Sequence, residues 1–315
     1  MAPIERIYVV VHKNDARYLG SFPENTANLL RTLSAAEITC HHVESLEELQ
    51  FQPGSVILAS GNFIPRQKAE NCLYVCFNWS VLFNLNARII SSWRAWRWIK
   101  ERRRLLMKKA PYYHAVLDYY PSQTPRLAKL LSRYPINVMP FLVDMNGPEG
   151  RIKAMRDRRW DICAVGSPSP RRMKAFADLE RAGCSLSPMD TTRMDSILGD
   201  SKLTLNIHFE RCDNLESPRL IPAFRLGSCV VTESCYGLDG LVPPRYYCAG
   251  SYRNLVPLCR ELLREPDRMD AIAESARLFV ETTYRKRCLD SWKAILNSLE
   301  KMQIPPTDTP RELCA

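Results

Sequence analysis

Glycine is scarce in this sequence, at 12 of 315 residues, and several signature motifs are missing altogether. The Walker A loop, the HExxH zinc motif and the motifs around a Ser-His-Asp triad are all absent, which argues against the chemistries that depend on them. Long apolar runs are also lacking. The run IYVVV near the N-terminus is far shorter than the roughly 20 residues of a membrane span, and it lacks a signal-peptide layout. We therefore expect a cytoplasmic protein that is not secreted.

Paired cysteine motifs are missing as well, although the chain has 12 cysteines. None of them falls in a CxxC pair. Cys72 and Cys76 lie in the strand-like run CLYVC, where buried free thiols are a commoner outcome than metal ligands. The scattered distribution indicates a reducing compartment rather than a disulfide scaffold.

Acidic residues are outnumbered by basic ones, which gives a formal charge of +10 and a pI near 9.1. Such an excess favours polyanionic partners, namely nucleic acid, anionic lipid or phosphorylated ligands, without choosing among them. The content of 46% hydrophobic and 25% charged residues is ordinary for a globular protein. A chain of 315 residues is comfortable for two domains of about 150 residues each.

The first half of the chain alternates apolar runs with helical patterns. The continuous β-branched run at residues 7–11 is typical of a strand buried in a parallel sheet. A helical pattern over residues 24–35 follows it, and strand, helix, strand at this spacing predicts right-handed crossovers. We expect further strands at residues 38–43, 55–59, 73–77, 113–119 and 136–142, with a helical stretch over 46–50.

The second half restarts the same pattern after a polar, turn-rich and basic linker, VDMNGPEGRIKAMRDRRW. The predicted fold class is α/β, with two Rossmann-like domains facing a cleft. Domain bounds are expected at 1–145 and 146–300, with a tail at 301–315. The second domain should hold strands at 160–165, 203–207 and 228–231, and helices at 171–183, 255–280 and 284–300.

Polar residues follow the predicted strands of the second domain. His208 comes after the strand LTLNI, and Glu233 comes after SCVVT, with Ser234 next to it. In open α/β sheets, ligands gather at the carboxyl ends of the strands. The alternatives are a buried histidine satisfied by backbone groups and an ordinary loop carboxylate.

The turn GSPSPRR at residues 166–172 precedes a predicted helix. Backbone N–H groups at a helix start attract phosphate, and Arg171 and Arg172 add fork-shaped donors suited to a diphosphate. Two arginines in a first helical turn oppose the helix dipole, so a nearby anion would resolve the conflict. Gly166 and Ser167 lie in the turn itself. The alternative is a solvated helix start.

The segment ESPR at residues 216–219 combines a carboxylate, a predicted helix start and an arginine. Ser217 and Pro218 have the pattern of an N-cap followed by proline at the first helical position. Glu216 has two acceptor oxygens that match a vicinal diol, and Arg219 would neutralise a departing diphosphate. The alternative is a surface ion pair between residues three apart.

The segments DICAVGSPSPRR, LTLNIHFE and LESPR…LGSCVVTES resemble the C-terminal domain of GT-B glycosyltransferases, in particular bacterial group-one and CgeB-like enzymes. The resemblance covers about residues 160–240, and the N-terminal half matches only in its layout. It implies a transferase with a nucleotide-sugar donor, catalytic roles for His208, Glu216 and Arg219, and donor-binding roles for the group Gly166, Ser167, Arg171, Arg172, Glu233 and Ser234. It also implies no cofactor and no metal, which agrees with the lack of a DxD pair at the expected strand end.

One position departs from this family pattern. Many relatives carry a second carboxylate that binds the nucleotide ribose one or two helical turns after the first, but Pro222 stands six residues after Glu216. The ribose contact then falls to Glu210 or Glu233. The departure equally fits a changed donor or a lost activity, which keeps a non-catalytic binding protein on the same fold as an alternative.

The N-terminal half gives weaker signals. An inverting enzyme needs a general base, and the loop after the first strand offers His12, Asp15 and Glu24, of which we select Asp15. The stretch SSWRAWRWIKERRRLLMKK at residues 91–109 is basic and rich in tryptophan, with Trp93, Trp96 and Trp98 near one helical face. It is typical of a helix on anionic lipid, of a nucleic-acid contact, or of a packing helix with a solvated basic face.

The expected function is therefore transfer of a hexose or pentose from a nucleotide sugar to a surface glycan, a lipid-linked sugar or a protein. Sugar transfer to modified bases of phage-type DNA is the alternative within the enzyme class, given the charge of +10. If the acceptor is a surface glycan, a lipid-linked sugar or a protein, we also expect residues 91–109 to contact the inner face of the membrane.

Overall fold

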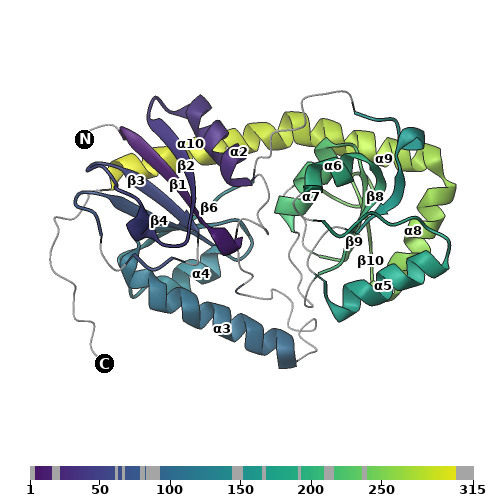
Figure 1. The fold of residues 1–315 in the computed structure, drawn as a ribbon, viewed down its shortest axis with the longest axis horizontal. Helices are drawn as coiled ribbons and strands as arrows, with labels where there is room; N and C mark the ends of the chain where they lie inside the picture. Colours follow the sequence, from purple (N-terminus) through teal and green to yellow (C-terminus); the bar gives the residue numbers. More distant parts are fainter. Residues whose placement is uncertain are drawn as a thin grey trace.

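The computed structural model describes residues 4–15, 22–60, 63–65, 68–78, 82, 93–143, 152–164, 168–190, 193–208, 216–235 and 240–302. The chain forms two α/β units, each built on its own parallel sheet (Figure 1). This architecture confirms the predicted α/β class.

The first sheet has six parallel strands in the order β2-β1-β3-β4-β5-β6. Its central strands are buried at every position, as expected for apolar runs covered on both faces. The six predicted strands are confirmed, and their bounds are β1 Arg6–His12, β2 Glu37–Val43, β3 Val56–Ser60, β4 Leu73–Asn78, β5 Ala115–Asp118 and β6 Asn137–Pro140. The predicted helical stretch at 46–50 is only a 3₁₀ turn, Leu46–Glu48, closed by a capping box between Ser45 and Glu48.

Two apolar layers cover the first sheet. One layer joins α2 (Phe22–Leu33) to one face of the sheet through Leu29 and Leu30. The other joins α3 (Trp93–Lys109) and α4 (Thr124–Leu131) to a second buried cluster through Leu106 and Leu127. Each helix therefore turns an apolar stripe toward the sheet.

The second sheet has four parallel strands in the order β10-β9-β8-β7. The strands are β7 Trp160–Cys163, β8 Ser201–Asn206, β9 Cys229–Glu233 and β10 Cys248–Gly250, and β10 was not predicted. The predicted helix at 255–280 is divided at Glu265, because Pro266 begins a new helix. The helices here are α5 Pro170–Arg181, α6 Met194–Gly199, α7 Ser217–Arg225, α8 Leu255–Arg264 and α9 Pro266–Phe279.

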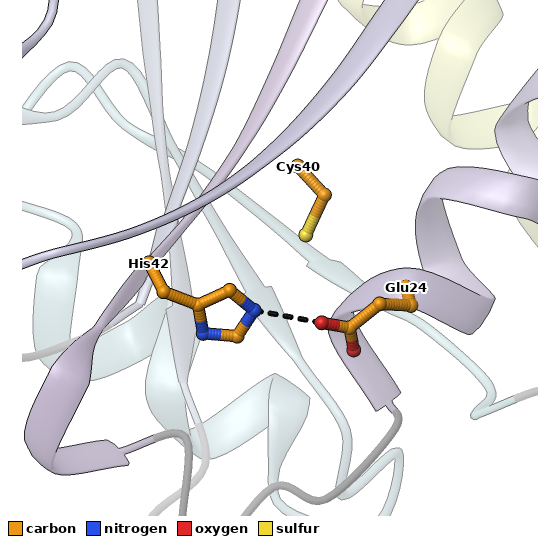
Figure 2. A group of neighbouring side chains, drawn as sticks. All are labelled: Glu24, Cys40 and His42. Atoms are coloured by element: carbon orange, nitrogen blue, oxygen red, sulfur yellow. Dashed lines mark hydrogen bonds and ion pairs between the residues drawn. The ribbon is translucent and has the colours of Figure 1, made fainter.

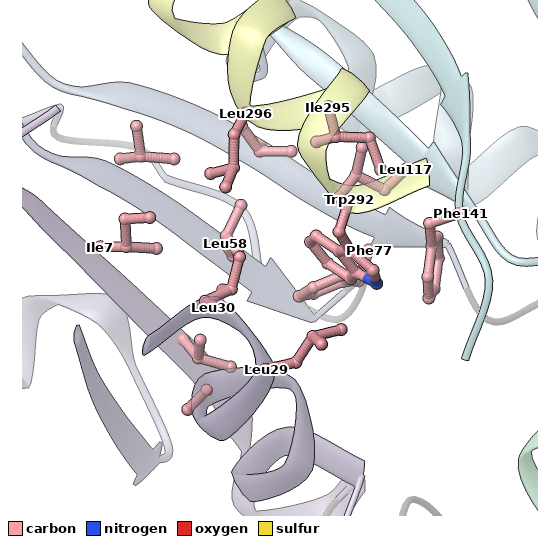
Figure 3. Packing of buried hydrophobic residues seen from close by; sticks show 14 of the residues in the cluster. Ile7, Leu29, Leu30, Leu58, Phe77, Leu117, Phe141, Trp292, Ile295 and Leu296 are labelled. Atoms are coloured by element: carbon pink, nitrogen blue, oxygen red, sulfur yellow. The ribbon is translucent and has the colours of Figure 1, made fainter. Parts of the chain in front are cut away.

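The last helix, α10 (Arg285–Lys301), packs on the first unit although it follows the second in sequence (Figure 1). Its buried face inserts Trp292, Ile295 and Leu296 into the core of the first sheet beside Phe77 and Phe141 (Figure 3). The indole Nε1 of Trp292 donates to the Leu142 carbonyl at 3.1 Å. The predicted bounds group this helix with the second domain, whereas its core contacts join the two halves of the chain.

Candidate functional site

Four chain segments meet at the carboxyl edge of the second sheet. Strand β8 ends at Asn206 and continues into His208, and its neighbour β9 ends at Glu233. Helices α5 and α7 begin at the same edge, because each follows a strand in a parallel crossover unit. This edge is where the predicted residues of the second domain are brought together.

Helix α5 presents its two arginines in the first turn, as predicted. Ser169 is the N-cap residue, with its hydroxyl accepting from the Arg172 backbone N–H at 3.3 Å, and Pro170 follows at the first helical position. Arg171 donates through Nη1 to the His208 carbonyl at 3.0 Å and forms an ion pair with Glu233. The sequence therefore fixes the start of α5 so that Arg171 bridges the ends of β8 and β9.

Tyr252 packs against Arg171. Its hydroxyl donates to the Arg171 carbonyl at 2.8 Å, and the guanidinium lies 4.8 Å from the centre of the tyrosine ring. Such a cation–π contact orients the arginine without neutralising its charge.

Glu233 is engaged by the protein on both carboxylate oxygens. Oε1 pairs with Arg171, and Oε2 accepts from the His208 backbone N–H at 2.9 Å. The side chain is nearly buried. In this arrangement Glu233 ties the end of β9 to the end of β8, a role that the prediction of ribose binding did not anticipate.

Arg172 is buried, with 3% of its surface exposed. Its Nε donates to the Ile207 carbonyl at 2.7 Å, and Nη2 lies 3.6 Å from Glu216 Oε1. A side chain so enclosed supports the strand end and the carboxylate beside it, whereas Arg171 is the more accessible of the two arginines.

Glu216 is the centre of the cluster. Its Oε2 lies 3.1 Å from Arg219 Nη1, and its Oε1 lies 3.4 Å from His208 Nδ1. The same Arg219 nitrogen donates to Asn206 Oδ1 at 2.9 Å. Helix α7 begins one residue earlier than predicted, so Glu216 rather than Ser217 occupies the N-cap position. The carboxylate therefore stands at the positive end of the helix, where a negative charge is stabilised.

Charge controls the protonation of Glu216. Burial alone would raise the pKa of its carboxyl, but Arg219, His208 and Arg172 hold that pKa well below its usual range. The carboxylate is consequently ionised at neutral pH. Among the described residues, the edge holds three arginines (Arg171, Arg172 and Arg219) against two glutamates, so positive charge exceeds negative charge in this part of the site.

The remaining predicted residues divide into three cases. Ser234 is exposed, and its backbone N–H donates to the Gly250 carbonyl at 2.9 Å, which extends the β9–β10 pairing. Gly166, Ser167 and Glu210 lie outside the described residues. Asp15 belongs to the first unit, where it follows β1 and accepts from the Ser60 hydroxyl at 2.8 Å. The described contacts therefore do not join Asp15 to the Glu216 cluster.

Pro222 is buried inside α7. Its ring stands where the family pattern has a second carboxylate, and no residue of the described cluster replaces that group at this turn of the helix. Two partners of the cluster were missed from the sequence, Asn206 and Tyr252. Asn206 had a usable signal, because it lies in the predicted strand 203–207 next to His208, whereas Tyr252 follows a strand of only three residues.

A cavity of about 350 Å³ lies between α5 and the segment that follows this helix. Helix α5 contributes Met173 and Phe176 to its wall, and the segment at residues 186–189 contributes Leu186 and Pro188. Trp160 and Glu180 also line the cavity, so it extends along α5, and none of the described residues of the Glu216 cluster is in its wall. Its volume is within the range of small-molecule pockets, roughly 300–1,000 Å³.

Helix α3 forms a separate charged surface on the first unit. Trp93 and Trp96 are 71% and 42% exposed, and their rings stack at 4.9 Å. Lys100 lies over the Trp96 ring. Trp98 does not share this face as predicted, because it is half-buried against the core of the first sheet. None of the helices in the described part of the chain combines the length and apolar character that a membrane crossing requires.

A scan against protein-family models found no match, and a search of curated proteins found none. Solved structures do resemble the chain. Sucrose-phosphate synthase from Thermosynechococcus elongatus has a TM-score of 0.55 at 12% identity, covering 94% of this chain and 98% of that one. A DNA-modifying beta-glucosyltransferase, solved with and without UDP-glucose, has a TM-score of 0.53 at 10% identity, covering 93% and 99%.

Anabaena HepE in complex with UDP and glucose gives a TM-score of 0.51 at 10% identity, covering 95% of this chain and 100% of that one. At sequence identities this low, the similarity shows a shared fold and does not show a shared activity. The comparisons and the two parallel sheets together show that the chain has the GT-B fold, with two Rossmann-like domains.

Proposed function

We propose that the chain is a glycosyltransferase that binds the diphosphate of a nucleotide-sugar donor at the carboxyl edge of the second sheet. One observation carries the proposal: Arg171, Arg219 and the starts of α5 and α7 converge on this edge around an ionised Glu216. Positive groups in excess of their carboxylate partners suit a ligand with two phosphates.

We assign roles to these side chains according to their exposure to solvent. Arg171 and Arg219, whose side chains are 21% and 16% exposed, would contact the diphosphate and stabilise the negative charge that develops as it leaves. Arg172 is buried and would position Glu216 and the end of β8. His208 and Glu216 would hold donor hydroxyls. These cationic groups supply the charge stabilisation without a metal ion in the proposed reaction.

The cavity along α5 has Met173 and Phe176 in its wall, and its volume of about 350 Å³ suits a small planar group such as a nucleotide base. Pro222 leaves the ribose without the second carboxylate of the family pattern. The donor sugar is a hexose or a pentose.

We infer a negatively charged acceptor from α3, which joins an exposed tryptophan pair to a basic helix on the first unit. Two acceptors fit this surface. The first is a glycan or protein at an anionic membrane, with α3 as a peripheral contact. The second is DNA, the molecule that the structurally similar beta-glucosyltransferase modifies.

Donor binding is tested by thermal unfolding of the full chain with UDP, GDP, ADP or CMP. We expect one nucleotide to raise the unfolding midpoint with its concentration, since ligand that binds only the folded state stabilises it. Arg171→Ala and Arg219→Ala should each weaken that nucleotide by about 10-fold or more, because each removes a charged hydrogen bond. Arg268→Ala is the matched control, because Arg268 pairs with the exposed Glu261 and Glu265.

If both site variants respond to the nucleotide as the wild type does, the assignment of the site is wrong. Catalysis is tested separately by hydrolysis of the corresponding nucleotide sugar. Bound nucleotide with no turnover, in the presence of both membrane and DNA acceptors, would favour the non-catalytic alternative that Pro222 keeps open.

The acceptor is tested by binding of the full chain to duplex DNA and to vesicles containing phosphatidylglycerol, over a series of salt concentrations. Binding to DNA with a steep salt slope that changes little in Trp93→Ala would favour DNA. Binding to vesicles that Trp93→Ala and Trp96→Ala weaken would favour a membrane-bound acceptor. Failure to bind either one would contradict the inference of a polyanionic acceptor.

A further inference from the structure

The start of α2 and the edge strand β2 bring three metal-ligating side chains together on the first unit. Cys40 and His42 are two residues apart on β2, so their side chains leave the same face of the sheet, and Glu24 reaches them from the first turn of α2. One ligand atom from each of the three residues lies within 4.8 Å of the other two. Figure 2 shows the Glu24 carboxylate facing the His42 ring with the Cys40 sulfur beside them.

Only side-chain movement separates this arrangement from a tetrahedral metal site. A zinc ion with bonds of about 2.0–2.3 Å places its ligand atoms about 3.5 Å apart. Glu24 Oε1 and His42 Nε2 are 2.7 Å apart and would have to separate, and the Cys40 sulfur lies within 4.8 Å of the other ligand atoms. Glu24 and His42 are both exposed, so each can rotate without disturbing the core. Cys40 is half-buried on the strand and would act as the fixed ligand.

The donor atoms select the class of metal. Sulfur, imidazole nitrogen and carboxylate oxygen together are ligands of zinc, whereas magnesium and calcium prefer oxygen alone. A thiolate and a carboxylate would also balance the charge of a divalent ion. Burial and the Glu24 carboxylate raise the pKa of Cys40 to about 12, while Arg31 acts in the opposite direction. Binding would therefore release the thiol proton to solvent as the sulfur gives its electron pair to the metal.

Arg31 carries a positive charge that interacts electrostatically with Cys40 and would disfavour a cation at this cluster. The guanidinium is held elsewhere, however, because Nη2 donates to the Ile38 carbonyl at 2.8 Å and Nη1 donates to Asn28 Oδ1 at 2.5 Å. Glu24 consequently pairs with His42 rather than with Arg31.

We propose that Glu24, Cys40 and His42 bind one zinc ion that fastens the start of α2 to the edge of the first sheet. The fourth position of the metal would be open to water, since the described residues contribute three ligands. This site is independent of the proposed glycosyl transfer, which takes place at the second sheet. A metal was not expected from the sequence, because the family resemblance implies none, and Glu24 is distant along the chain from Cys40 and His42.

The test titrates the metal-free full chain with zinc chloride and, for spectroscopy, with cobalt chloride. We expect one equivalent of metal to bind, a rise in the unfolding midpoint, and a thiolate-to-cobalt charge-transfer band. Cys40→Ser, His42→Gln and Glu24→Gln should each lower the affinity by about 10-fold or more, and Cys40→Ser should also abolish the charge-transfer band.

Two neighbours serve as matched controls. His41 is adjacent on β2, but its ring stacks on Tyr8 and its Nε2 contacts Thr39, so His41→Gln should leave metal binding unchanged. Cys184 is another half-buried thiol, located in the second unit, so Cys184→Ser should also have no effect.

The proposal is wrong if the chain binds less than one equivalent, or if the ligand variants bind metal as tightly as the wild type. It is equally wrong if His41→Gln or Cys184→Ser weakens binding to the same degree. Should Cys40→Ser fail to fold, Glu24→Gln decides the question, because Glu24 is exposed and its replacement leaves the core intact.

Discussion

The carboxyl edges of the two sheets each hold a buried or partly buried carboxylate, and the groups around the two carboxylates differ in charge. Asp118 ends β5 in the first sheet and is fully buried, and the described side chains that donate to it are neutral: Asn78 and Gln123 at 3.0 and 2.9 Å, and Thr124 at 3.3 Å. Glu216 in the second unit contacts two arginines and a histidine.

The pKa values of the two carboxyls diverge accordingly. Burial raises the pKa of Asp118 to about 7, against the lowering effect of its hydrogen bonds. The cations around Glu216 outweigh its burial and hold its pKa well below the usual range. The comparison teaches that a polar edge alone does not mark a ligand site. At the first edge the buried carboxyl of Asp118 is hydrogen-bonded by neutral groups. At the second edge the described arginines outnumber the glutamates, so positive charge is in excess.

The same isosteric change at the two positions should give the largest contrast. Glu216→Gln removes the negative charge from between Arg172 and Arg219, and it should lower the free energy of unfolding by about 2–4 kcal/mol. Asp118→Asn keeps an oxygen for Asn78 and Gln123 and should cost less than about 1 kcal/mol. Urea unfolding at pH 7 measures both. Equal losses in the two variants would contradict the contrast between the edges.

The pH dependence of stability should separate the two carboxyls by slopes of opposite sign. The folded pKa of Asp118 is about 7 and its unfolded value is about 3.9, so the folded state binds the extra proton between these values. Stability from this group is complete below about pH 4 and is lost as the pH rises to about 7, at no more than about 1.4 kcal/mol per pH unit.

Glu216 should show the opposite slope. Its folded pKa is depressed, so its stabilising effect is present above about pH 4.3 and is lost as the pH falls below that value. Unfolding free energies measured from about pH 3 to about pH 8 should lose the upper slope in Asp118→Asn and the lower slope in Glu216→Gln. A wild-type profile that both variants reproduce would show that neither carboxyl titrates differently on folding.

The sequence predicts those features of the two edges that depend on neighbouring residues in the chain. The β-branched runs predict the strands, and the carboxyl ends of parallel strands must share an edge, so the meeting of His208, Glu216 and Glu233 follows from local patterns. The helix predicted at 171–183 likewise corresponds to α5, which begins at Pro170 after the N-cap Ser169. These features depend on residues close to one another in the chain.

The parts that the sequence does not predict depend on partners far apart in the chain. The pattern of α10 shows an apolar face but does not say that Trp292 packs beside Phe77. The meeting of Glu24 with Cys40 and His42 requires the packing of α2 against β2. Strand β10 is only three residues long, so its pairing with β9 is set by the sheet rather than by its own residues.

The smallest expected effect concerns the support that Tyr252 gives to Arg171 at the second edge. Tyr252→Phe removes the hydrogen bond from the tyrosine hydroxyl to the Arg171 carbonyl but keeps the ring against the guanidinium. It should cost about 0.5–1.5 kcal/mol of stability and change the nucleotide response little. Tyr252→Ala also removes the cation–π contact and should weaken the nucleotide response by a few-fold, since Arg171 would then lose its orientation.

The comparison of the two Tyr252 variants separates orientation from stability. Unfolding midpoints with and without nucleotide, measured for both variants, give the stability loss and the nucleotide response independently. If Tyr252→Phe weakens the nucleotide as much as Tyr252→Ala does, the ring does not orient Arg171, and the hydroxyl itself would be the group that matters. If neither variant changes the response, Arg171 is held well enough by Glu233 and the His208 carbonyl, and the second edge is rigid without its aromatic support.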